Sequence, residues 1–100
     1  MRRKRLWVYK CNERDEPYQT AWGNWDDVFD KPEEQEWGGE WGIKSPASIH
    51  ILRQEMRPRD LILSYQTDRK VAVGLCELTK LTEDQDGKRV MIVKPLLQFE

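Results

Sequence analysis

The chain has 100 residues, of which 38% are hydrophobic and 35% are charged. This length and balance are typical of one small globular domain and exclude a disordered chain. No apolar run approaches the roughly 20 residues that span a bilayer, which excludes a membrane helix. The basic start "MRRKR" is followed only by "LWVY" before Lys10, too little for a secretory signal. We therefore expect a single cytoplasmic domain over residues 1–100, with no membrane partner.

Potential metal ligands and reactive groups are few. Two cysteines, Cys11 and Cys76, and the single histidine, His50, lie far apart, so they do not form the closely spaced ligand set of a structural zinc site. Both cysteines lie in apolar stretches, which favours reduced packing residues over a disulfide or a reactive thiol. The sequence has no Gly-rich phosphate loop and no Ser-His-Asp set, so we expect neither a cofactor nor catalysis.

The distribution of charge is more informative than its total. A formal net charge of -1 argues against a protein that grips nucleic acid by bulk charge. Basic residues nevertheless cluster at residues 2–5 and again over 53–70, whereas acidic residues concentrate in 26–36 and 82–87. The basic clusters form either an ordinary solvated surface or, if the fold brings them to one face, a surface for phosphates.

The N-terminal half combines one strand with a long irregular stretch. Residues 6–10, "LWVYK", are β-branched or aromatic between charged residues and predict a first strand. From residue 12 to 44 the pattern gives way to Pro, Gly and acidic residues, and predicts a long loop. A short helix inside it is expected after Asn24, which offers a capping oxygen, with Val28 and Phe29 turned inward. This loop is too rich in tryptophan to be disordered, since it holds Trp22, Trp25, Trp37 and Trp41.

The main helix is predicted from about Pro46 to Met56. Ser45 offers an N-cap oxygen, Pro46 has the fixed φ of a first helical position, and Pro58 ends the helix. Its apolar stripe consists of Ile49, Leu52 and Met56.

A run of strands follows the helix. The alternation of residues predicts strands over 61–66, 71–78 and 89–94, with turns at 67–70 and 82–88. Residues 96–100 are compatible with the start of another strand. We expect an antiparallel meander with the strand 6–10 alongside. The fold class is therefore α+β: a small, partly closed β-barrel with one main helix and a long Trp-rich loop.

Three segments carry a family resemblance: "LWVYKCN", "EWGIKSPASIHILRQEM" and "RPRDLILSYQTDRKVAVGLCEL". In this order they resemble the EVE domain and, more distantly, the YTH domain, both of the PUA-like superfamily. The match covers residues 6–78, and "LILSYQTDRKVAVGLCE" is its most specific part. Arg59-Asp60 stands where the family usually has Gly-Asp, so a turn that exploits glycine must be made otherwise. The chain is also shorter than is common for EVE domains, which implies a minimal version, a fragment or a module of a larger protein.

The resemblance implies a reader of modified bases, in which a flipped base enters an aromatic pocket. An aromatic face restores roughly 1 to 3 kcal/mol of the stacking that a flipped base loses. The residues expected around the base are Lys10, Cys11, Asn12, Trp22, Trp25, Trp37, Trp41, Ser45, Tyr65, Gln66 and Thr67. The residues expected to contact phosphates are Arg53, Arg57, Arg69 and Lys70, together with residues 2–5.

Structural roles compete with several of these assignments. Trp7, alternating in the first strand, is expected in the core. Trp22 and Trp25 either wall the pocket or cover the end of the barrel. Ser45 taken alone is an N-cap, and Tyr65 is either a pocket residue or a buried aromatic whose hydroxyl bonds a carbonyl.

Four functions remain open. The first is a non-enzymatic module that recognises a modified base in DNA, joined to a nuclease or motor protein as in modification-dependent restriction. The second is an RNA reader like YTH or PUA domains. The third is a small hydrolase of the related ASCH group, which needs a Lys and a carboxylate together, such as Lys10 with Glu13 or Lys44 with Glu40. The fourth is a protein-interaction module that binds a partner through its tryptophans.

Overall fold

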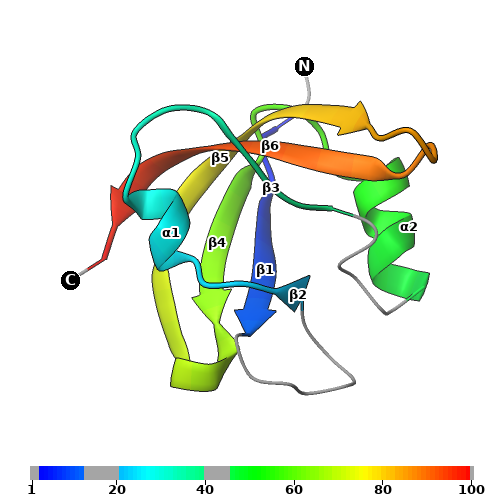
Figure 1. Ribbon diagram of the computed structural model, residues 1–100. Coiled ribbons are helices and arrows are strands. Elements are labelled where there is room, and N and C mark those ends of the chain that lie inside the picture. Colours follow the sequence, from blue (N-terminus) through cyan, green and yellow to red (C-terminus); the bar gives the residue numbers. More distant parts are fainter. Residues whose placement is uncertain (1–2, 13–20, 40–45, 100) are drawn as a thin grey trace.

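A single curved sheet makes up most of the computed structural model, which describes residues 3–12, 21–39 and 46–99. In chain order the elements are β1 (Leu6–Asn12), β2 (Ala21–Trp22), α1 (Asp26–Phe29), β3 (Gln35–Gly39), α2 (Pro46–Gln54), β4 (Leu61–Gln66), the 3-10 turn η2 (Thr67–Arg69), β5 (Val71–Glu83) and β6 (Arg89–Gln98). The strands are ordered β2-β1-β4-β5-β6-β3, and Figure 1 shows them curving into a half-barrel. This architecture agrees with the small α+β barrel expected from the sequence. No helix within the described ranges is long and apolar enough to cross a membrane.

The predicted meander is confirmed. Strands β4, β5 and β6 pair antiparallel in succession, and β1 lies beside β4 in parallel. At the far edge of the sheet β3 pairs antiparallel with β6. Because β1 and β4 run in the same direction, their carboxyl ends lie side by side although they are distant in sequence.

The core fills the concave side of the sheet. Side chains of β4 alternate strictly, so that Ile62, Ser64 and Gln66 point inward. The buried hydrophobic residues are Tyr9, Cys11, Trp25, Val28, Leu52, Met56, Ile62, Val73, Cys76, Leu78, Met91 and Val93. They come from both helices and from β1, β4, β5 and β6, so one core holds the described elements together.

Both helices agree with the sequence prediction in their packing. The N-cap residue of α1 is Trp25, which makes no side-chain cap bond. Asn24, one residue earlier, still supplies the expected oxygen, because its Oδ1 accepts a hydrogen bond from the Asp26 N–H at 2.9 Å. Leu52 and Met56 are buried, and Ile49 is half-buried. The helix α2 ends two residues before the predicted Met56, but the Met56 N–H still donates to the Ile51 carbonyl at 3.0 Å.

The predicted loop over residues 12–44 was wrong in two places, where the chain forms β2 and β3. Strand β3 carries two glycines, a composition that usually argues against a strand. Gly38 has a φ of 75°, and a Cβ there would lie 2.5 Å from Oη of Tyr9. The Tyr9 hydroxyl in turn accepts a hydrogen bond from the Gly39 N–H at 3.2 Å. Glycine is therefore needed here because β3 passes directly over the Tyr9 hydroxyl.

The last two strands are longer than predicted. Strand β5 runs to Glu83 instead of ending at residue 78, and β6 runs to Gln98 instead of ending at residue 94. Residues 96–98 therefore continue the strand that precedes them. A register shift between Leu75 and Cys76 accommodates Pro95, which lacks the N–H of a regular ladder.

Arg59 and Asp60 form the turn before β4 without a glycine. Arg59 adopts a left-handed conformation, with a φ of 79°, a region of backbone conformation that favours glycine. The adjacent Asp60 is fully buried, and its carboxylate accepts hydrogen bonds from Trp7 Nε1 at 2.9 Å, Arg57 N at 3.0 Å and Arg5 N at 3.2 Å. These bonds over-determine the turn and hold Arg59 in a strained conformation. Trp7 is half-buried and packs against the core, as expected.

Candidate functional site

The carboxyl ends of β1 and β4 bring together residues that the sequence predicted around a base. Lys10 pairs in register with Tyr65, and Cys11 pairs with Gln66. Asn12 is the last residue of β1, and Thr67 directly follows β4. We call Cys11, Asn12, Gln66 and Thr67 the carboxyl-end cluster. Asn12 and Gln66 are fully or almost fully buried, with exposures of 2% and 0%.

The pleat of the sheet separates the predicted residues into two groups. Lys10 is exposed and Tyr65 is half-buried, and both lie on the outer face of the sheet. Cys11 and Gln66 alternate with them and point to the interior. Lys10 and Tyr65 therefore do not line the interior with the carboxyl-end cluster, although they are its neighbours in sequence.

Three aromatic residues pack beside the carboxyl-end cluster. The ring of Trp25 lies edge-on to Tyr9, with centroids 5.9 Å apart, and is tilted by 38° against Trp37 at 5.4 Å. Trp25 has no exposed surface, and its Nε1 donates to the Tyr9 carbonyl at 3.0 Å. Trp25 is therefore part of the core and has no accessible surface with which to wall a pocket. Trp37 is only half-buried and is the member of this group that retains accessible surface.

Gln66 holds the segment before α1 in place. Its Oε1 accepts a hydrogen bond from Trp25 N at 2.9 Å, and its Nε2 donates to the Gly23 carbonyl at 3.0 Å and to Asp68 Oδ1 at 2.6 Å. Both amide hydrogens are thus used within the protein. Gln66 positions the aromatic residues and has no N–H left for a ligand.

Two further buried polar atoms belong to the carboxyl-end cluster or to the aromatic residues beside it. Nε1 of Trp37 and Oγ1 of Thr67 are buried and have no oxygen or nitrogen partner within the described ranges. The first is a donor and the second both donates and accepts. Buried polar atoms are almost always paired. The Trp37 indole lies against the Cys11 thiol, so the Thr67 hydroxyl is the atom with bonding capacity left for a further polar group.

The two thiols are protonated at neutral pH. Burial raises the pKa of Cys11 to about 12; the indole of Trp37 partly offsets this rise, and the charge of Asp68 adds to it. Burial likewise raises the pKa of Cys76 to about 11, partly offset by the Ser64 hydroxyl. Both cysteines are free and buried, which confirms the predicted packing role. A protonated, buried thiol is a poor nucleophile.

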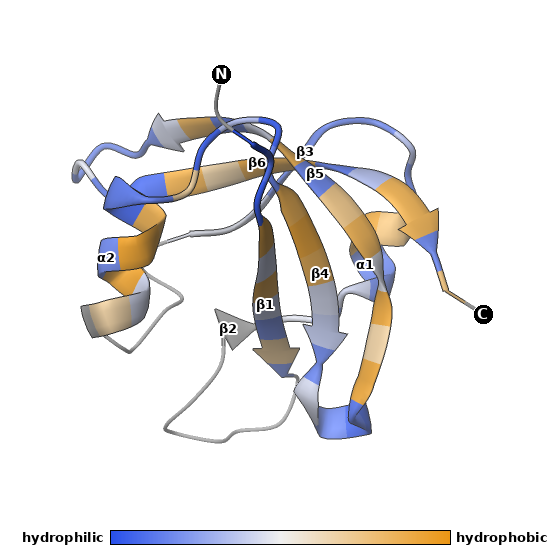
Figure 2. Cartoon of the chain, turned by 180° about the vertical axis from the view of Figure 1, so that it is seen from behind, coloured by the Kyte–Doolittle hydropathy of each residue, from blue (hydrophilic) through white to orange (hydrophobic). Residues whose placement is uncertain are grey.

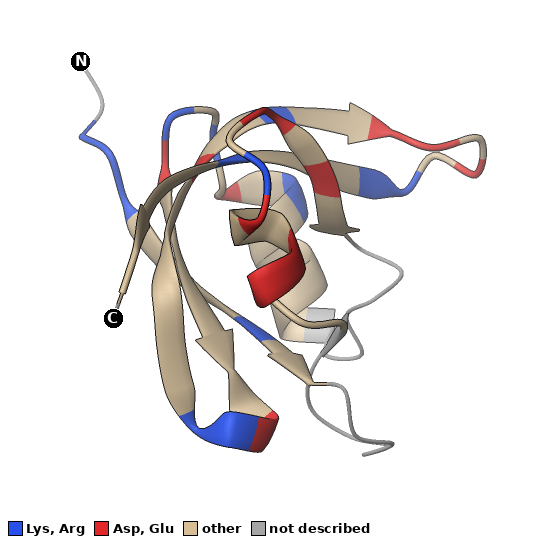
Figure 3. Cartoon of the chain, turned by 60° about the vertical axis from the view of Figure 1, so that its left-hand side comes forward, with Lys and Arg blue, Asp and Glu red and all other residues tan. Residues whose placement is uncertain are grey.

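The predicted phosphate contacts come from different parts of the fold, and Figure 3 shows Lys and Arg distributed over several elements. Arg53 lies on α2 and Arg57 precedes β4, whereas Arg69 and Lys70 follow the other end of β4. Arg69 is also paired with Asp26, at 3.1 Å. Only Arg69 and Lys70 are close in sequence to the carboxyl-end cluster.

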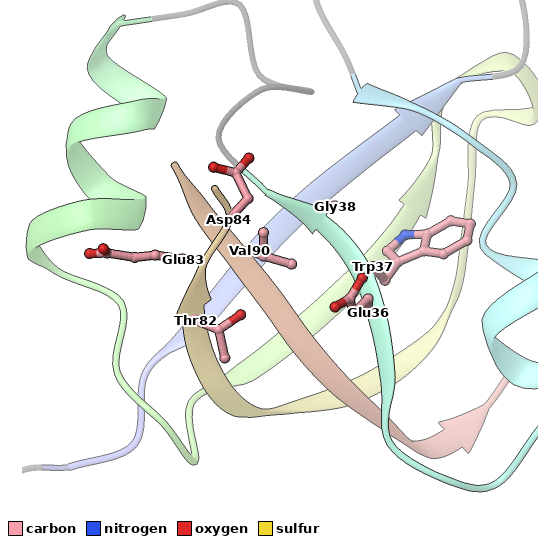
Figure 4. Close-up of a pocket in the computed structure, with 7 residues that line it drawn as sticks. All are labelled: Glu36, Trp37, Gly38, Thr82, Glu83, Asp84 and Val90. Atoms are coloured by element: carbon pink, nitrogen blue, oxygen red, sulfur yellow. The ribbon is translucent and has the colours of Figure 1, made fainter. Parts of the chain in front are cut away.

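Two hollows lie away from the carboxyl-end cluster. The larger, about 320 Å³, is lined by Glu36, Trp37, Gly38, Thr82, Glu83, Asp84 and Val90. Figure 4 shows the indole of Trp37 pointing away from the carboxylates of Glu83 and Asp84. With three acidic residues in its lining, this hollow repels phosphates. The smaller, about 110 Å³, lies between β1 and α2 and is below the usual size of ligand sites, roughly 300 to 1,000 Å³.

Several predicted residues lie outside the described residues: Arg2, Glu13, Glu40, Trp41, Lys44 and Ser45. Trp22 lies in β2, where its backbone pairs with Asn12. Sequence reasoning missed Asp60 and Tyr9 as positioning residues. The alternation of Tyr9 with Cys11 in the first strand was a signal for Tyr9, whereas nothing in the sequence indicated the three bonds to Asp60.

No group of three or more His, Cys, Asp or Glu side chains within the described ranges is placed to hold a metal ion. In comparisons with known proteins, the chain matches no family model, no curated protein and no solved structure. The role of the carboxyl-end cluster therefore follows from its own residues.

Proposed function

We propose that the chain is a non-enzymatic nucleic-acid-binding module of the PUA-like type that receives a flipped, modified base beside the carboxyl-end cluster. The observation that carries the proposal is the parallel pairing of β1 and β4, which gathers Cys11, Asn12, Gln66 and Thr67 next to Trp37. The resemblance to EVE domains points to a modified cytosine or adenine in DNA, read on behalf of a nuclease or motor protein.

The chemistry near the carboxyl-end cluster suits a base. An aromatic face stacks on any base, and such stacking is worth roughly 1 to 3 kcal/mol. Trp37 retains accessible surface, and Trp41, from the same Gly-rich stretch, is expected to contribute a second wall. The Thr67 hydroxyl, which has no hydrogen-bond partner within the described ranges, can bond the edge of a base, where donors and acceptors lie in fixed directions.

Rigid support around the carboxyl-end cluster also favours binding. Gln66 fixes the segment that carries Trp25, and Trp25 in turn packs against Trp37. At the opposite ends of β1 and β4 the Asp60 carboxylate joins the two strands. A preorganised site loses less conformational entropy when a ligand binds, which raises affinity for a base of one shape.

The experiment that tests this function removes the Thr67 hydroxyl. Thr67→Val keeps the shape of the side chain, and we expect it to lower affinity about tenfold for duplexes carrying one 5-methylcytosine, 5-hydroxymethylcytosine or N6-methyladenine, whichever the wild type prefers. Thr79→Val is the matched control, because the Thr79 hydroxyl donates to the Ile92 carbonyl at 3.1 Å, away from the carboxyl-end cluster. Equal affinities of wild type and Thr67→Val, with unchanged melting of both, would contradict the assignment.

A further inference from the structure

Strand β1 has one edge that the described strands cover only in part. On one side β1 pairs with β4 over Leu6–Cys11, but on the other side β2 pairs only with Cys11 and Asn12. Figure 1 shows β2 against the carboxyl end of β1 alone. Within the described ranges, the stretch from Leu6 to Lys10 is therefore an open strand edge, and we call it the β1 edge.

Bonds near the two ends of β1 show which backbone groups point out of the β1 edge. On the side of β4 the Leu61 N–H donates to the Arg5 carbonyl at 2.8 Å, whereas on the side of β2 the Gly23 N–H donates to the Asn12 carbonyl at 3.2 Å. Alternate residues of a strand direct their N–H and C=O groups to opposite sides, so the even-numbered residues of β1 face away from β4. In the part of the chain that the structure describes, no strand pairs with the backbone donors and acceptors of Leu6, Val8 and Lys10 on this side.

The β1 edge is accessible, and a hollow lies beside it. Leu6 is 57% exposed and Val8 is 54% exposed. Figures 1 and 2 show α2 on the side of β1 that faces away from β4. The hollow of about 110 Å³ between them is lined by Trp7, Val8 and Tyr9 from β1, and by Ser48, Ile51, Leu52 and Met56 from α2 and the turn after it. This mostly apolar lining suits single aliphatic side chains better than a whole small molecule.

The charge around the β1 edge is positive. Residues 3–12 include no Asp or Glu, and Lys4 and Lys10 are exposed near the two ends of the edge. Figure 3 shows Lys and Arg along the segment that enters β1. Arg5 already pairs with Glu55 at 3.7 Å. The two lysines repel a second copy of the same edge and attract a strand that carries acidic residues opposite them.

We propose that the β1 edge binds an extended segment of another protein by β-augmentation, with apolar side chains directed into the hollow and acidic residues opposite Lys4 and Lys10. The unpaired N–H and C=O groups recur at every second residue, a spacing that a second extended polypeptide backbone matches and a phosphate backbone does not. The bound segment lies beside the middle of β1, whereas the carboxyl-end cluster lies at its end. The interaction is therefore independent of the base-binding function proposed above.

Binding of a short peptide to the full chain tests the proposal. The probe is a fluorescently labelled Glu-Val-Thr-Leu-Thr-Val-Glu, whose order of side chains is the same from either end. With its glutamates opposite Lys4 and Lys10, its Val and Leu side chains point toward the hollow in either strand direction. Fluorescence anisotropy should give a dissociation constant on the order of 100 µM, because a short flexible segment loses conformational entropy on binding.

The matched control is the same peptide with methyl groups on the backbone nitrogens of its three central residues. It keeps every side chain but cannot donate these backbone hydrogen bonds, so we expect it to bind about tenfold or more weakly. Equal binding of the two peptides, or no binding of either, would overturn the proposal.

Two variants of the protein test the backbone and the charge separately. Val8→Pro removes an N–H that points out of the β1 edge and leaves the ladder with β4 intact, so it should weaken binding of the probe about tenfold. Lys10→Glu should weaken binding about fivefold, and a probe with one terminal Glu replaced by Lys should restore it. The matched control is Lys94→Glu, since Lys94 is also exposed but lies on β6, away from β1.

Thermal melting of each variant shows whether it is folded, and Lys10→Glu tests the proposal even if Val8→Pro does not fold. An equal effect of Lys10→Glu and Lys94→Glu would contradict the proposal. A wild-type dimer that Val8→Pro dissociates would also contradict it, because a second copy would then occupy the β1 edge.

Discussion

The indole nitrogen of Trp7 donates a hydrogen bond to the buried carboxylate of Asp60, with 2.9 Å between Nε1 and Oδ2. The same carboxylate accepts from the backbone N–H groups of Arg5 and Arg57. Asp60 thus ties the start of β1 to the turn before β4. Because the two strands are fixed in register at this end, Cys11 and Gln66 meet at the other end.

Substitution of Asp60 should destabilise the fold without touching the carboxyl-end cluster. Asp60→Asn directs an amide N–H toward one of three donors, and we expect a loss of about 1–3 kcal/mol in the free energy of unfolding. Asp60→Ala leaves all three donors unpaired and should cost more than Asp60→Asn. Urea unfolding followed by tryptophan fluorescence measures both. Trp7→Phe removes only the bond from Nε1 and serves as the control. If the losses in free energy of unfolding from Trp7→Phe and Asp60→Asn simply add in the double variant, the two side chains are not directly coupled.

Two glycines with nearly equal φ allow the cost of backbone strain to be distinguished from the cost of a steric contact. Gly38 and Gly87 have φ values of 75° and 77°, but a Cβ at Gly87 meets nothing within 4 Å. Gly87→Ala should therefore cost only the left-handed strain, about 1–2 kcal/mol. Gly38→Ala adds a contact with the Tyr9 hydroxyl and should cost about 1–3 kcal/mol more. Thermal melting compares the two, and equal losses would show that β3 does not depend on close approach to Tyr9.

The buried thiols make stability fall at alkaline pH. Folding raises the pKa of Cys11 from 9.0 to about 12 and that of Cys76 from 9.0 to about 11, so the unfolded chain loses these protons first. Their contribution is fully present below pH 9 and is lost progressively between pH 9 and 11 to 12. Each pH unit in this window removes up to about 1.4 kcal/mol per thiol.

Melting temperatures between pH 7 and 10 check this prediction, because the buried Tyr9, whose usual pKa is 10.0, adds its own loss only at higher pH. The double variant with Cys11→Ala and Cys76→Ala should show a flatter profile than the wild type above pH 9. A wild-type profile that stays level from pH 9 to pH 10 would rule out the protonated, buried thiols.

Strongly patterned segments were predictable from sequence, and features that depend on distant partners were not. Strand β4 and the start of β5 follow from alternation, and α2 follows from Ser45, Pro46 and its apolar stripe. Strand β3 was missed because Gly38 and Gly39 are favourable only with Tyr9 and β6 opposite them. The ends of β5 and β6 were missed because each extends as far as the other offers hydrogen bonds.

Part of the arrangement at the candidate site could be predicted. The resemblance selected Cys11 and Asn12, the end of a predicted strand selected Gln66 and Thr67, and these four residues lie together because β1 and β4 pair in parallel. The sequence did not show that Lys10 and Tyr65 point outward, away from the carboxyl-end cluster, because the direction of their side chains depends on strand register. Nor did the sequence distinguish Trp25 from Trp37, since the burial of Trp25 follows from its bonds to Gln66 and Tyr9.

The salt dependence of oligonucleotide binding tests where the phosphates lie on the protein. If phosphates lie next to the carboxyl-end cluster, reversing Arg69 and Lys70 to Glu should weaken oligonucleotide binding and flatten its dependence on salt, by roughly one unit of slope per lost contact. Reversing Arg53 and Arg57 to Glu is the matched control, because both lie toward the other end of β4. Fluorescence titrations at several salt concentrations measure the slopes. Equal effects of the two reversals would indicate general electrostatics and no oriented binding.

The most direct measurement of the central claim is a fluorescence titration of the full chain against duplexes of one sequence, each with a single 5-methylcytosine, 5-hydroxymethylcytosine or N6-methyladenine, or with no modification. Trp41→Ala is titrated in parallel. We predict that the wild type binds at least one modified duplex about tenfold or more tightly than the plain duplex. Trp41→Ala should lose most of this difference while melting normally, because the lost stacking of roughly 1 to 3 kcal/mol belongs to the bound state. Equal binding of all four duplexes by a folded wild type would contradict the claim.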